Sequence, residues 1–126
     1  MKNITALLLI LFCAPLMAED YYQTYLQVNN KSDTQIYVSI EASLCSDHNG
    51  NIAPGRYNGW TIGGCRTNGK IWFSDKIYVP FKTPIGDTKY GKTMYLFIAG
   101  KDPAGYYVDR TKNGSEFERI RAWIEQ

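Results

Sequence analysis

The chain has 126 residues, of which 44% are hydrophobic and 21% are charged, and its formal net charge is +2. This length predicts one small domain with a modest core. Because both signs of charge are scattered along the chain, the sequence lacks the basic patch of a nucleic-acid-binding protein and the polybasic segment of a membrane anchor. We therefore expect neither nucleic acid nor stable membrane insertion.

Residues 1–18 have the pattern of a secretory signal peptide. Lys2 precedes an apolar run at 6–12, and Ala18 is a suitable residue before a cleavage site. The run is too short to span a bilayer, and no later stretch is long enough. Lipidation at Cys13 is disfavoured because the bulky Phe12 precedes it. We expect a signal peptide at 1–18, a single domain at 19–126, and a protein that is periplasmic or secreted.

Two cysteines, Cys45 and Cys65, remain after the leader. In an oxidising compartment an even pair predicts a disulfide. The bond would close a loop of about twenty residues and would stabilise the domain by roughly 3 kcal/mol.

The first half of the chain predicts two clear strands. Residues 22–28 and 34–42 alternate between apolar and polar side chains, and the turn-forming NNKSD at 29–33 separates them. The simplest pairing is an antiparallel hairpin. Residues 43–69 are rich in glycine and asparagine, so we expect a loop there, tied by the disulfide and holding one short strand near 57–62.

The most strand-like segment is KIWFSDKIYVP at 70–80. One parity, which we expect to face the core, contains Ile71, Phe73, Ile77 and Val79. The other, which we expect to face outward, contains Lys70, Trp72, Ser74, Lys76 and Tyr78. Asp75 interrupts the apolar parity and predicts a bulge or bend.

Residues 92–99 are apolar on both parities, which predicts a strand buried on both faces in the centre of its sheet. A short strand at 105–110 follows, and Asn113 with Gly114 is the strongest hairpin signal in the chain. The tail at 115–125 fits either a capped helix or a strand. We favour a strand because the tail follows a tight turn in a chain rich in strands.

Six to seven short strands separated by turns predict an all-β fold, a small antiparallel two-sheet β-sandwich with one disulfide. The order VNNKSDTQIYVSI, APGRYNGWTI, GKIWFSDKIYV resembles the opening of thaumatin-like sandwiches. This resemblance implies the sandwich alone.

The outward parities predict a binding surface. Its expected members are Tyr25, Tyr37, Trp72, Tyr78, Lys70 and Lys76. If their strands share a sheet, these side chains form an aromatic patch of the kind found at protein interfaces. The competing explanation, of equal weight, is the ordinary preference of strands for aromatic residues.

The sequence contains no recognisable catalytic set. His48 is the single histidine, and neither a positioned nucleophile nor an orienting group accompanies it. We therefore expect a non-enzymatic exported protein that needs no cofactor and binds another protein. It would be a periplasmic inhibitor or immunity-type partner, or a secreted factor that acts on a host. The oligomeric state stays open.

The segment GKDPAGYYVDRTKNGSEFERI at 100–120 supplies an alternative. It resembles the calcium-dependent galactose-binding lectin sandwiches of bacteria. That resemblance implies a calcium ion held by Asp102, Asp109 and Asn113, with Tyr106 nearby, and a glycan as the partner. Arg110 stands where such lectins have an adjacent asparagine ligand.

Overall fold

The computed structural model describes residues 24–42, 45–62, 65–83, 93–114 and 116–124, so the predicted signal peptide lies outside it. The described residues form ten strands, and the predicted number of six to seven was therefore wrong. The strands are β1 (Thr24–Asn30), β2 (Ile36–Ala42), β3 (His48–Ile52), β4 (Tyr57–Ile62), β5 (Thr67–Trp72), β6 (Ile77–Thr83), β7 (Thr93–Asp102), β8 (Gly105–Lys112), β9 (Glu118–Arg121) and β10 (Trp123–Ile124). No described segment is a helix of the length and apolarity needed to cross a membrane.

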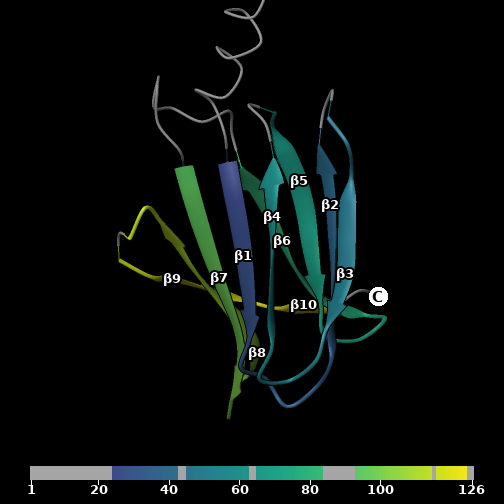
Figure 1. The fold of residues 1–126 in the computed structure, drawn as a ribbon. Coiled ribbons are helices and arrows are strands. Elements are labelled where there is room, and N and C mark those ends of the chain that lie inside the picture. Colours follow the sequence, from purple (N-terminus) through teal and green to yellow (C-terminus); the bar gives the residue numbers. More distant parts are fainter. Residues whose placement is uncertain (1–23, 43–44, 63–64, 84–92, 115, 125–126) are drawn as a thin grey trace, which may run out of the picture.

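Two five-stranded sheets lie face to face, which confirms the all-β sandwich (Figure 1). Sheet A has the order β4-β1-β7-β8-β9, and sheet B has the order β10-β6-β5-β2-β3. The prediction of purely antiparallel sheets was wrong, because β1 runs parallel to β7. Strands that are consecutive in the chain often lie in opposite sheets, so the chain passes repeatedly between the two layers.

The core lies between the sheets and is built from the alternating positions of the inner strands. Its fully buried large side chains are Leu26, Val28, Ile36, Val38, Ile40, Ile62, Ile71, Val79, Phe97 and Val108. Phe81 and Phe97 meet across the two sheets with ring centroids 4.7 Å apart. The alternation read from the sequence in β1 and β2 is confirmed, because their apolar parities are buried.

The predicted hairpin between the first two strands was wrong, since β1 belongs to sheet A and β2 to sheet B. The buried Asn30 directs the chain from one sheet to the other. Its side-chain amide donates to the carbonyl oxygens of Thr34 and Ile52, both at 2.8 Å, while its Oδ1 accepts from the N–H and hydroxyl of Ser32. These bonds satisfy a buried amide completely and replace a tight β-turn with a crossover.

The glycine-rich segment forms more regular structure than its composition predicts. The short strand near 57–62 is confirmed as β4, but β3 was missed because it has few apolar residues. β3 pairs with β2 and β4 pairs with β1, so their connection crosses from sheet B to sheet A. The predicted disulfide between Cys45 and Cys65 is confirmed, with the two Cα atoms 6.3 Å apart.

Residues 70–80 form a hairpin rather than a single strand. β5 ends at Trp72, and β6 begins at Ile77 and returns antiparallel to it. The N–H of Phe73 donates to the carbonyl of Ile77 at 2.7 Å, which closes the turn that contains Asp75. The predicted division into an inward and an outward face still holds, because the turn leaves Ile71 and Val79 opposite each other on one face and Trp72 and Tyr78 opposite each other on the other.

β7 lies in the centre of sheet A, as predicted, but it is not buried on both faces. Its inward residues are buried, whereas Met94 on the outward face is 41% exposed. The signal from Asn113 and Gly114 is confirmed as a turn between β8 and β9, with φ of 50° and 75°.

The tail is extended, which confirms the strand over the helix. β9 pairs with β8 in sheet A, and β10 pairs with β6 in sheet B. The chain crosses between the sheets at Ala122, whose N–H donates to the carbonyl of Tyr106 at 3.1 Å. The last strand is therefore placed beside the β5–β6 hairpin.

Candidate functional site: an aromatic row on sheet B

One row of side chains crosses the outer face of sheet B. The pairing registers place Asn51 opposite Tyr37, Tyr37 opposite Trp72, Trp72 opposite Tyr78, and Tyr78 opposite Trp123. Residues directly opposite one another in antiparallel strands point to the same face. We call Tyr37, Trp72, Tyr78 and Trp123 the aromatic row.

The two middle rings of the aromatic row are in contact, and the ends of the row are open to solvent. The rings of Trp72 and Tyr78 have centroids 4.7 Å apart and an interplanar angle of 39°. The ammonium of Lys70 lies 5.2 Å from the Trp72 ring and 4.8 Å from the Tyr78 ring, where the negative faces of the rings attract it. Tyr37 is 38% exposed and Trp123 is 63% exposed, so the ends of the row are the most accessible.

The structure brings together four of the six residues that the sequence predicts for the binding surface. Tyr37, Trp72, Tyr78 and Lys70 share the outer face of sheet B. Tyr25 does not belong with them, because β1 lies in sheet A. There its ring covers Gly59, where an added Cβ would lie 2.1 Å from the tyrosine oxygen.

Lys76 lies in the turn between β5 and β6, where its N–H donates to the Ser74 hydroxyl at 3.3 Å. Trp123 was missed as a member of the row. If the tail at 115–125 is a strand, alternation places Trp123 on its outward parity, but only the pairing of β10 with β6 places it beside Tyr78.

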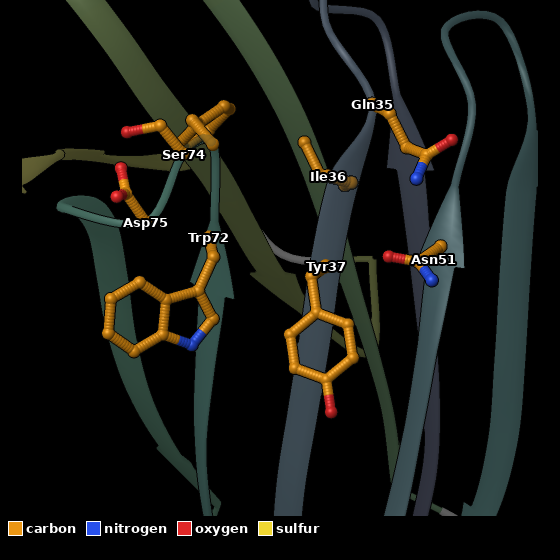
Figure 2. A pocket seen from close by; sticks show the side chains of 8 residues that line it. Gln35, Ile36, Tyr37, Asn51, Trp72, Ser74 and Asp75 are labelled. Carbon is orange, nitrogen blue, oxygen red and sulfur yellow. The ribbon is translucent and has the colours of Figure 1, made fainter.

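A pocket of about 430 Å³ opens beside the row at the end of sheet B nearest the β5–β6 turn. It is lined by Gln35, Ile36, Tyr37, Asn51, Trp72, Phe73, Ser74 and Asp75. Figure 2 shows the rings of Tyr37 and Trp72 side by side with their broad faces toward the viewer and the indole nitrogen edge toward Tyr37. The two rings thus offer flat apolar surface, and the amides, hydroxyl and carboxylate around them offer hydrogen bonds.

Asp75 has no ion-pair partner among the described residues. Four other acidic residues, Asp33, Asp102, Asp109 and Glu118, each bind a lysine or an arginine. The pocket therefore contains a carboxylate that no described lysine or arginine neutralises.

A different cluster occupies the outer face of sheet A. The guanidinium of Arg119 lies 3.8 Å from the centroid of the Tyr107 ring and donates to both carboxylate oxygens of Asp109, at 2.8 and 3.0 Å. Hydrogen bonds from Arg121, together with its charge and that of Arg119, lower the pKa of Asp102 to about 2. In this cluster every charge has a partner within the chain.

Only two residues of the calcium alternative share a cluster, since Arg119 binds both Asp102 and Asp109. The carboxylates of Asp102 and Asp109 bind arginines, and Asn113 lies at the far end of β8, where its Oδ1 accepts from the N–H of Met94 at 2.8 Å. Across the described part of the chain, no three side chains of histidine, cysteine, aspartate or glutamate form a group that could hold a metal ion. His48 lies half-buried on the edge strand β3.

Comparison with protein-family models, with curated proteins and with solved structures gave no significant match to this chain, so its site has to be interpreted from its own geometry.

Proposed function

We propose that this chain is an exported, non-catalytic binding protein that captures another protein through the aromatic row. The observation that carries the proposal is the shared register of Tyr37, Trp72, Tyr78 and Trp123 across four neighbouring strands. Tyrosine and tryptophan are enriched at the centres of protein interfaces, where they bury much area and lose little side-chain entropy. A rigid sheet presents them in one fixed arrangement.

The charged groups around the row also support a protein partner. Lys70 is held over two of the rings, and the unpaired Asp75 lies at the pocket beside the row. A mixture of aromatic area with isolated charges of both signs is suited to a polar protein surface. Within this proposal the partner is an enzyme or toxin that the chain inhibits, or a protein of a host.

Site-specific photocrosslinking in the native host tests the proposal. A photoreactive phenylalanine analogue replaces Tyr37 or Trp123 in the row, and a matched control replaces Tyr57, which is 69% exposed on sheet A. We expect a discrete adduct from the row positions and none from position 57. Equal adducts from all three positions, or none from the row, would overturn the proposal.

Loss of affinity for the captured protein provides the second measurement. Replacing Trp72 and Tyr78 with alanine removes the middle of the row, and we expect a loss of at least tenfold in affinity, in line with aromatic hot spots. Tyr57→Ala serves as the matched control. The melting temperatures of the native chain, the variant that lacks Trp72 and Tyr78, and Tyr57→Ala show whether folding is retained.

A sugar-binding module is the second candidate, and the broad open faces of Trp72 and Tyr37 beside the amides of Gln35 and Asn51 favour it. Aromatic faces stack on sugar rings, and amides bind hydroxyl groups. A glycan array run with and without a chelator separates the candidates. Silence on every glycan in both conditions would eliminate this one.

A further inference from the structure

The pocket beside Tyr37 and Trp72 has the groups that recognise one particular side chain. It combines two flat aromatic rings with a carboxylate, Asp75, that has no partner among the described residues. The other polar groups that line it, Gln35, Asn51 and Ser74, are neutral. The lining therefore carries one negative charge. Lys70 is directed to the Trp72 and Tyr78 rings, and Lys76 follows Asp75 in the exposed turn without lining the pocket.

The same chain contains a filled example of this arrangement. On sheet A the guanidinium of Arg119 stacks on the ring of Tyr107 and binds both oxygens of Asp109. A planar guanidinium suits both contacts at once, because its face packs on a ring while its edge forms a fork of two N–H groups that fits a carboxylate. The pocket on sheet B presents rings and a carboxylate without an arginine of its own.

We propose that the pocket formed by Tyr37, Trp72 and Asp75 receives an arginine side chain of the partner protein. The guanidinium stacks on the broad face of the Trp72 indole and directs its N–H groups to the carboxylate of Asp75. Gln35 and Asn51 lie beyond Tyr37, on the side of the pocket away from Asp75, and contact the backbone of the partner next to its arginine. This inference rests on the proposed function, since it names the side chain by which the partner anchors to the aromatic row.

Arginine fits this site better than lysine for a geometric reason. The ammonium of lysine is a compact, strongly hydrated charge and cannot stack as a plane. A neutral sugar can also donate its hydroxyl groups to the carboxylate of Asp75, but it carries no positive charge. Preference for the charged arginine probe over a neutral probe of the same shape therefore separates arginine recognition from sugar binding.

Nuclear magnetic resonance of the indole N–H groups provides the test. The chain has three tryptophans, so the Trp72 signal is assigned by its loss in Trp72→Phe, and Trp60 and Trp123 act as internal references. The folded protein is titrated with N-acetyl-arginine methylamide. Matched probes are the citrulline analogue, which has nearly the same shape without the charge, and the lysine analogue.

We expect a saturable shift of the Trp72 signal with the arginine probe at millimolar concentrations. The citrulline probe should bind at least about fivefold more weakly, because it cannot form charge-assisted hydrogen bonds. Asp75→Asn should weaken the arginine probe by a similar factor. The control Glu41→Gln, which alters another exposed acid on the outer face of sheet B, should leave it unchanged. Asp75 lies in an exposed turn, so the melting temperature should stay the same.

Several results would overturn the inference. These are the absence of a saturable shift, equal affinity for the arginine and citrulline probes, unchanged affinity in Asp75→Asn, or a shift with a chitin or cellulose oligosaccharide but not with arginine. The photocrosslinking experiment keeps the two proposals apart. An adduct at position 37 or 123 that forms with the same yield in Asp75→Asn as in the native background leaves the protein partner in place and refutes the arginine anchor. A Trp72 shift with arginine in a chain that gives no adduct refutes the protein partner and retains the pocket.

Discussion

The guanidinium of Arg121 donates hydrogen bonds to both carboxylate oxygens of Asp102, at 2.7 and 2.8 Å. The pair joins the end of β7 to β9 across β8. Because these bonds favour the charged carboxylate, they lower the pKa of Asp102 from 3.8 to about 2. The interaction should therefore make the stability of sheet A depend on pH in acid.

The direction of this dependence follows from the lowered pKa. The unfolded chain binds the proton of Asp102 below about pH 4, whereas the folded chain resists protonation until about pH 2, so the stabilisation is present above pH 4 and is lost as the pH falls through 2. We expect Asp102→Asn to melt at a lower temperature than the native chain at neutral pH, and the difference to vanish near pH 2. Melting followed by circular dichroism across this range checks it, with Glu41→Gln as a control. A difference that is constant with pH would contradict the assignment.

Asn30→Asp should destabilise the fold strongly. The side-chain amide of Asn30 is buried and donates to two carbonyl oxygens, so a carboxylate there would place oxygen against oxygen. We expect a loss of about 3 kcal/mol in the free energy of unfolding, from lost bonds and unsatisfied buried groups. Urea unfolding measures it. The matched control is Asn49→Asp on the exposed side of β3, which should change stability little.

Gly69→Ala tests how tightly the core packs against β5. An added Cβ would lie 2.1 Å from the tip of the Phe81 ring, which is buried and packs on Phe97. Because the ring has no free space to enter, we expect a loss of about 2 kcal/mol from overpacking. The double variant Gly69→Ala with Phe81→Leu should lose less than the sum of the two single variants, as measured by urea unfolding. Full additivity would show that the two positions do not interact.

Removal of the disulfide should lower stability without changing the fold. The bond joins residues separated by twenty positions, and replacing Cys45 and Cys65 with serine should lower the free energy of unfolding by about 3 kcal/mol. Adding a reductant to the native chain should reproduce the effect and should have none on the double variant. An unchanged urea midpoint in both experiments would show that the bond is dispensable.

For the strands with clear alternation, the buried face could be predicted from the sequence, whereas the neighbouring strands could not. Alternation placed Val38 and Ile71 in the core and Tyr37 and Trp72 outside, because side chains point to opposite faces of a strand in turn. The parallel pairing of β1 with β7 joins segments far apart in the chain, and no local pattern encodes it. The prediction of a hairpin between β1 and β2 was wrong for the same reason. The crossover after β1 depends on the hydrogen bond from Asn30 to the carbonyl of Ile52, which is distant in the sequence.

The candidate site was predictable to the same extent. Tyr37, Trp72 and Tyr78 were found by their parity, and their alignment in one row required the registers of β2, β5 and β6. Tyr25 has the same kind of parity and lies in the other sheet. The pocket at Asp75 depends on where the chain turns between β5 and β6. The sequence did not indicate this turn, because residues 70–80 were predicted as one strand.

Because the chain alternates between the two sheets, each sheet needs strands from early and late parts of the sequence before it can fold. β1 lies between β4 and β7, and β6 gains its second neighbour only from β10 at the end of the chain. Neither sheet can therefore be completed from a contiguous segment. Nearly the whole chain has to be synthesised before all the strands of either sheet can pair. Distant pairings of this kind fold slowly. For the proposed export, this order of events would let the chain pass through a channel in an extended form, and the sandwich and its disulfide would form on the far side.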